Sequence, residues 1–125
     1  MSDSRKKILW IEDDHLLGTI VSKDFAGEFN LMIAINADEA FQILKGMTPD
    51  LIIVDLVLPG DKNGFEILKK LSEDSRLKDI PSIVLSNLSK QADIDRAMSF
   101  GAKKYLVKAT MSLEQIKQEV RAVMS

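Results

Sequence analysis

Short apolar runs alternate along the chain with longer segments in which apolar residues recur at helical spacing. The runs are rich in branched side chains, which is typical of buried strands, and they cover residues 7–11, 31–35, 51–54, 82–85 and 105–107. Between them, apolar residues three or four positions apart, such as Phe41 and Leu44, indicate one face of a helix. The pattern therefore predicts five strands that alternate with five helices.

Polar residues mark several predicted helix boundaries. Asp14, Ser89 and Ser112 are predicted N-caps, and Gly101 is predicted to end the helix that follows Ser89. Strands joined by crossover helices pair in parallel, with helices on both faces of the sheet. We therefore expect an α/β fold, a flavodoxin-like doubly wound five-stranded sheet in the order 2-1-3-4-5 with five helices. Short connections predict a single domain over residues 1–125, with no output domain in this chain.

Acidic residues follow two of the predicted strands. Glu12 and Asp13 come directly after the run 7–11, and Asp55 follows the run 51–54. In the expected strand order these two strands are neighbours, so the three carboxylates should share one pocket where the strand order reverses. Such a group repels itself unless a cation enters, and hard oxygen ligands favour Mg²⁺. The absence of cysteine and the single histidine disfavour zinc.

Composition narrows the possible functions. Hydrophobic residues at 46% and charged residues at 29% are ordinary for a globular domain. No apolar run approaches the roughly 18 residues of a spanning helix, and no signal peptide follows the first residues, so we expect a cytoplasmic protein without membrane contact. The formal net charge of -2 argues against nucleic-acid binding by this domain.

The segments IEDD, LIIVDLVLPG, IVLS and GAKKYLVKA follow one another at spacings that resemble the receiver domain of two-component response regulators, of the CheY-like single-domain type. The likeness extends over almost the whole chain. It implies that Asp55 is the phosphoacceptor. It also implies that Mg²⁺ is held by Glu12, by Asp13, by Asp55 and by the backbone carbonyl of Val57.

Three further residues acquire roles from this resemblance. The Ser86 hydroxyl and the Lys108 cation would meet the phosphoryl oxygens, while Ser86 and Tyr105 would form the switch. The implied donor is a sensor histidine kinase or a histidine phosphotransfer protein. A downstream protein would bind the face formed by the fourth helix, fifth strand and fifth helix. The chain would be a phosphoacceptor that assists its own phosphorylation and dephosphorylation, not an enzyme, and a monomer or a phosphorylation-dependent dimer.

The sequence departs from the common family pattern at several positions. Ala109 stands where a proline in a cis peptide is usual, and a cis bond before a non-proline residue costs roughly 3 kcal/mol, which leaves the geometry of this peptide open. Asn87 replaces a small residue next to Ser86, which implies either a tighter phosphoryl entry or an added hydrogen bond. Val57 and Leu88 are apolar at positions where family members often carry polar residues that can position water. We therefore hypothesise that the aspartyl phosphate is long-lived.

Three other classes of protein fit parts of the sequence pattern. A phosphorylation-independent interaction module on the same fold is the main alternative, and absence of magnesium binding would favour it. In a flavin-binding electron carrier, the acids after the first strand would repel the flavin phosphate. A magnesium-dependent phosphatase with an aspartate nucleophile would require a second acid two residues after Asp55, where Val57 stands.

Overall fold

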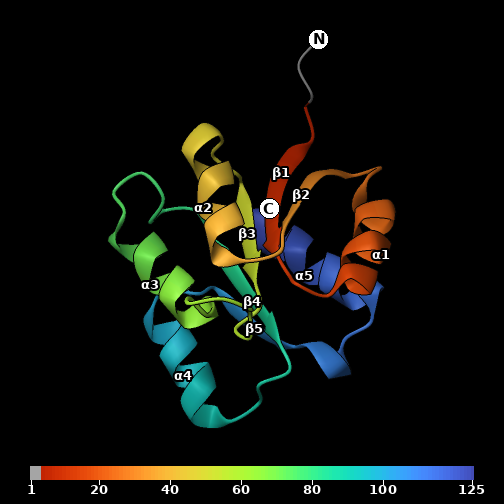
Figure 1. The fold of residues 1–125 in the computed structure, drawn as a ribbon. Coiled ribbons are helices and arrows are strands. Elements are labelled where there is room, and N and C mark those ends of the chain that lie inside the picture. The colour runs from red at the N-terminus through yellow and green to blue at the C-terminus, as the bar shows by residue number, and fades with distance from the viewer. Residues whose placement is uncertain (1–3) are drawn as a thin grey trace.

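One parallel sheet organises the computed structural model, which describes residues 4–125. Its order is β2-β1-β3-β4-β5 (Figure 1), and the strands are β1 (Lys6–Ile11), β2 (Phe29–Ala34), β3 (Leu51–Val54), β4 (Ser82–Ser86) and β5 (Lys104–Val107). The helices are α1 (His15–Phe25), α2 (Ala37–Gly46), α3 (Gly64–Glu73), α4 (Gln91–Ser99), the short 3-10 helix η1 (Lys108–Thr110) and α5 (Leu113–Met124). The predicted fold class and strand order are confirmed.

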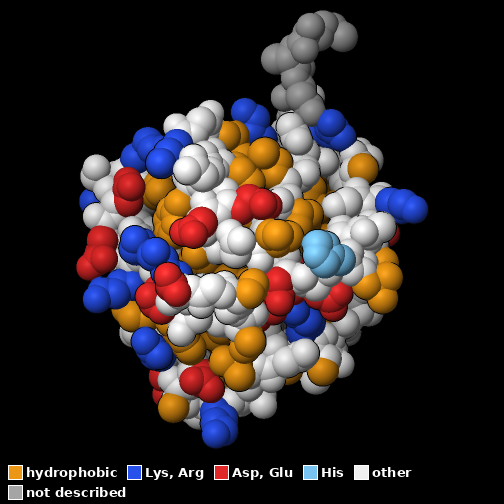
Figure 2. Space-filling model, in the orientation of Figure 1, with side chains coloured by type: hydrophobic (Ala, Val, Ile, Leu, Met, Phe, Trp, Pro, Cys, Tyr) orange, Lys and Arg blue, Asp and Glu red, His pale blue; other side chains and the backbone are white. Residues whose placement is uncertain are grey.

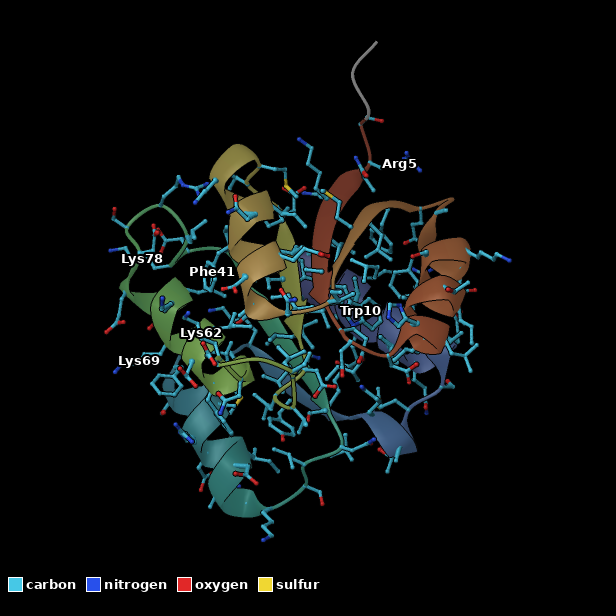
Figure 3. The ribbon with its side chains drawn as sticks, viewed as in Figure 1. Arg5, Trp10, Phe41, Lys62, Lys69 and Lys78 are labelled. Atoms are coloured by element: carbon cyan, nitrogen blue, oxygen red, sulfur yellow. The ribbon has the colours of Figure 1, made fainter. Side chains whose placement is uncertain are left out.

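The helices cover both faces of the sheet, with α1 and α5 on one side and α2, α3 and α4 on the other (Figure 1). Side chains alternate across β1, so Leu9 and Ile11 enter one core cluster while Ile8 and Trp10 enter the other. Trp10 lies fully buried between the sheet and α1 (Figure 3), edge-on to the ring of Phe25 at 5.5 Å. Residues 8–11 of β1 are fully buried, so the acids that follow Ile11 emerge at the carboxyl-end edge of the core.

The predicted helix caps have different outcomes. Asp14 and Ser112 accept backbone hydrogen bonds from the first turns of α1 and α5, as predicted. The prediction for Ser89 is wrong, because the N-cap of α4 is Lys90 and makes no side-chain cap bond. Gly101, with φ of 96°, follows the end of α4. The helix α4 begins without a side-chain cap bond, and its one buried residue, Ala97, lies in its second half. We therefore infer that its start is weakly anchored.

The surface carries both signs of charge. In the view of Figure 2, acidic and apolar side chains share the middle of the face, while most Lys and Arg side chains lie toward its outline. Among residues 4–125, no helix is long and apolar enough to cross a membrane. The single domain predicted over residues 1–125 includes residues 1–3, which lie outside the described part, and its extent stays a prediction.

Candidate functional site

Three acids converge at the carboxyl ends of β1 and β3. Ile11 and Val54 are the last paired residues of these two strands, so the acids that follow them emerge side by side. Glu12, Asp13 and Asp55 each place one carboxylate oxygen within 4.8 Å of the others. Glu12 is 1% exposed and Asp55 is 6% exposed, whereas Asp13 faces solvent. The strand order thus assembles the acidic cluster that the sequence predicts.

Backbone hydrogen bonds hold these carboxylates in place. The N–H of Glu12 donates to the carbonyl of Ala34 (2.8 Å), and the N–H of Asp55 donates to the carbonyl of Ile11 (3.1 Å). Both acids are therefore attached to the sheet. The Asp55 Oδ1 atom also accepts the N–H of Val57 at 3.1 Å, which fixes the orientation of the carboxylate.

Lys108 joins the two buried acids. It follows β5, and its side chain reaches across the end of β4 to place Nζ 2.6 Å from Oε1 of Glu12 and 2.8 Å from Oδ2 of Asp55. The lysine side chain is 19% exposed, so the ammonium is largely shielded from water. Its positive charge offsets part of the negative charge of the cluster.

Burial and pairing shift the titration of this group. Burial raises the pKa of Glu12, and the nearby charge of Asp55 adds to the rise; hydrogen bonds from Lys108 and from the Asp14 N–H oppose it without cancelling it. For Lys108 burial acts to lower the pKa, but the hydrogen bonds to Asp55 and Glu12 outweigh it and the pKa is raised. Lys108 therefore stays protonated at neutral pH and supplies a fixed positive charge.

The end of β4 places two adjacent side chains differently. Ser86 is fully buried, and its Oγ accepts the N–H of Leu88 at 3.4 Å. Asn87 instead lines the acidic pocket. From β5, the hydroxyl of Tyr105 donates to the carbonyl of Leu88 at 2.5 Å, while its ring packs partly buried against the cluster that contains α2, α3 and α4 residues. Both Ser86 and Tyr105 thus bond to the same residue of the β4–α4 loop.

The acids surround a pocket of about 320 Å³ that is open to solvent. Its lining comes from the loops after four strands and comprises Glu12, Asp13, Asp14, Asp55, Val57, Asn87 and Lys108. Val57 lies at the edge of the pocket and is 58% exposed. The role of the Val57 carbonyl as a metal ligand stays a prediction, as does the contact of Ser86 with a phosphoryl group.

Comparison with known proteins identifies the family of this chain. The family model for the response regulator receiver domain matches residues 8–121. This chain belongs to the receiver domain family. It is 32% identical over 123 residues to the transcriptional regulatory protein KdpE of Staphylococcus aureus, covering 95% of this chain and 50% of that protein. The receiver thus spans about half the length of this relative.

Solved structures resemble the receiver closely in fold. One is the phosphorylated cyanobacterial phytochrome response regulator RcpA, at a TM-score of 0.82 and 28% identity, with 96% of this chain and 91% of that chain covered. Another is the Mn²⁺-bound response regulator Rcp1, at a TM-score of 0.78 and 26% identity, with 94% and 91% covered.

A glycine supports the loop that carries the phosphoacceptor candidate. Gly64 begins α3, and a Cβ atom there would lie 2.2 Å from the backbone oxygen of Asp55 and 2.6 Å from Cα of Leu56. Only a residue without a side chain permits this approach. The site prediction missed Gly64, although a glycine at the start of a helix after a Pro-Gly turn was visible in the sequence.

The acidic cluster of the receiver fits a hard divalent cation. Its three side chains offer carboxylate oxygens, the ligands that Mg²⁺ prefers, and contain no sulfur or imidazole donor. Asp13 faces solvent, which gives an ion access to the buried pair. The donor set is therefore suited to a Mg²⁺ ion that keeps some of its water ligands.

Proposed function

We propose that this receiver accepts a phosphoryl group on Asp55 in a Mg²⁺-dependent reaction, from the phosphohistidine of a sensor histidine kinase or a histidine phosphotransfer protein. The observation that carries the proposal is a nearly buried Asp55 carboxylate in one pocket with two further acids and a lysine. A carboxylate is a competent nucleophile and needs no general base. Acyl phosphate formation therefore requires mainly positioning and compensation of charge.

The transfer exchanges one bond to phosphorus for another. An oxygen of Asp55 forms the new bond while the phosphorus–nitrogen bond of the donor breaks. The departing nitrogen keeps the bonding pair, so the histidine leaves as neutral imidazole when its second nitrogen carries a proton. The Val57 N–H orients the Asp55 carboxylate, and Lys108 provides a positive charge beside it.

A bound Mg²⁺ would be held by the carboxylates of Glu12, Asp13 and Asp55 and by the carbonyl of Val57, and it would supply positive charge to offset that of the phosphoryl oxygens. The phosphorylated form of RcpA and the Mn²⁺-bound form of Rcp1, both similar to this chain in fold, support the proposal. The receiver is then a phosphoacceptor that assists its own phosphorylation and dephosphorylation and not an enzyme acting on a separate substrate.

The signal would leave through the face of α4, β5 and α5. Ser86 and Tyr105 both bond to Leu88, so a phosphoryl group that draws Ser86 toward Asp55 would also disturb the Tyr105 contact. The weakly anchored start of α4 adjoins this loop. We propose that a downstream protein binds this face, and that the receiver is cytoplasmic. This domain would contact neither nucleic acid nor membrane. The receiver would be a monomer or a phosphorylation-dependent dimer.

The test is the mass of the intact protein after incubation with acetyl phosphate, with and without Mg²⁺. Wild type should gain one phosphoryl group only with Mg²⁺, and Asp55→Asn should gain none. Asp61→Asn is the matched control, because it makes the same change at an exposed position of the same loop. No gain by wild type from acetyl phosphate or a phosphohistidine donor would favour a phosphorylation-independent interaction module.

A further inference from the structure

A side chain links the two loops that follow β4 and β5. Ser86 and Val107 are the last paired residues of these strands. Beyond them, the N–H of Ala109 donates to Oδ1 of Asn87 at 2.8 Å. Because an N–H can only donate, the amide oxygen must face Ala109, which fixes the orientation of the Asn87 amide. The bond continues the β4–β5 connection past the end of the ladder.

This bond depends on both departures from the family pattern. Proline has no N–H, so the donor exists because residue 109 is alanine. The residues from 4 to 125 contain no cis peptide bond, and the Lys108–Ala109 peptide is therefore trans. A small side chain at position 87 would not extend far enough to supply the acceptor. Asn87 and Ala109 thus form a matched pair.

The bond between Asn87 and Ala109 lies next to Lys108, which directly precedes Ala109. The short helix η1 contains both residues and contributes no residue to the buried core, so core packing does not hold it. Its bonds to distant parts of the described chain are those of the Lys108 ammonium to the two acids and that of Ala109 to Asn87. Asn87 also lines the pocket.

We propose that Asn87 is a positioning residue for phosphoryl transfer: by accepting the Ala109 N–H, its amide holds the turn of Lys108 at the distance from Asp55 that the reaction uses. The inference rests on the proposed function of Asp55. A bound Mg²⁺ and a phosphoryl group bonded to Asp55 would occupy carboxylate oxygens that Lys108 contacts, so the ammonium would lose these contacts. The Asn87 bond does not involve those oxygens, so it keeps the lysine turn in place.

The experiment compares wild type, Asn87→Ala, Asn87→Asp and Ser89→Ala. Asn87→Ala removes the acceptor, whereas Asn87→Asp keeps an acceptor of the same shape and serves as the geometric control. Ser89→Ala changes an exposed residue of the same loop. Exchange of the Ala109 amide with solvent is followed by NMR, and the maximal rate of phosphorylation by acetyl phosphate is measured together with the half-saturating Mg²⁺ concentration.

In Asn87→Ala the Ala109 amide should exchange about five- to tenfold faster, and the maximal phosphorylation rate should fall by a similar factor, as expected for one neutral hydrogen bond. The half-saturating Mg²⁺ concentration should stay within about twofold of wild type, because the three acids are intact. Asn87→Asp should retain slow exchange at Ala109, and Ser89→Ala should match wild type in every measurement.

The outcomes separate this inference from the proposed function. If wild type is phosphorylated and Asn87→Ala is phosphorylated equally fast, the positioning role is wrong while the acceptor stands. If Asn87→Ala lowers the rate but leaves exchange at Ala109 unchanged, the role is also wrong, because the effect does not pass through this bond. Wild type that gains no phosphoryl group would overturn the proposed function and this inference with it.

Discussion

The Nζ atom of Lys108 lies 2.6 Å from Oε1 of Glu12, at the opposite end of the chain. Glu12 is almost completely buried, so the lysine compensates a charge that water does not reach. The same ammonium contacts Asp55. A divalent cation entering the acidic cluster would therefore compete with Lys108 for carboxylate oxygens.

Lys108→Met should strengthen Mg²⁺ binding and weaken phosphorylation. Removing the competing ammonium frees the oxygens of Glu12 and Asp55, so we expect Mg²⁺ to bind about tenfold more tightly. The rate of phosphorylation by acetyl phosphate should fall at least about tenfold, because a charge that stabilises the phosphoryl oxygens is lost. Calorimetric titration and intact mass measure the two effects.

Lys104→Met is the matched control for this substitution. Lys104 pairs with Glu119 on the α5 side of β5, outside the pocket. It should leave both Mg²⁺ affinity and phosphorylation unchanged. Equal Mg²⁺ affinity in wild type and Lys108→Met would show that the lysine and the ion do not compete.

Glu12→Gln should alter the pH dependence of stability. Burial raises the pKa of Glu12 in the folded protein above its usual value near 4.5, so the folded state binds this proton at a higher pH than the unfolded chain does. The contribution of Glu12 to the free energy of unfolding therefore increases as the pH falls through the folded pKa, and levels off below the unfolded pKa. The glutamine variant has no proton to gain.

Urea unfolding between about pH 8 and about pH 4, followed by Trp10 fluorescence, measures this difference. Wild type should gain stability relative to Glu12→Gln as the pH is lowered. A difference that is constant with pH, or one that changes in the opposite direction, would contradict the raised pKa.

Gly64→Ala should destabilise the protein by at least about 2 kcal/mol, because the new Cβ would overlap the backbone of Asp55 and Leu56. Gly18→Ala is the control. A Cβ at Gly18 would lie 3.8 Å from Cγ2 of Ile33, an ordinary contact, and alanine should stabilise the interior of α1 by about 0.5 to 1 kcal/mol. Thermal unfolding of both variants measures the contrast, and equal effects would contradict the close approach at Gly64.

Tyr105 should ionise only above its usual pKa near 10. Burial raises the pKa of the phenol, and the negative charges of Asp93 and Asp55 add to the rise. As the chain has a single tyrosine, ultraviolet titration reports this residue alone. Asp93→Asn should lower the pKa and Asp95→Asn should not, so equal pKa values in wild type and Asp93→Asn would contradict the proposed charge effect.

The sheet and the placement of the acids followed from local patterns. Apolar runs of strand length alternate with helical segments, and this alternation restricts the chain to few topologies. Glu12 and Asp55 interrupt such runs at their ends, and parallel strands bring these ends to one edge of a sheet. The acidic cluster was therefore predictable from sequence, as were the N-caps at Asp14 and Ser112.

The contacts within the pocket depended on tertiary structure. The pairing of Lys108 with Glu12 and the bond between Asn87 and Ala109 join residues from different loops. The close approach of Gly64 to the Asp55 backbone joins the two ends of one loop. Their geometry depends on how the helices set those loops and on which rotamers the packing allows. Hydrophobic periodicity determined which segments form the sheet, but only packing in three dimensions decided which polar atoms meet at its edge.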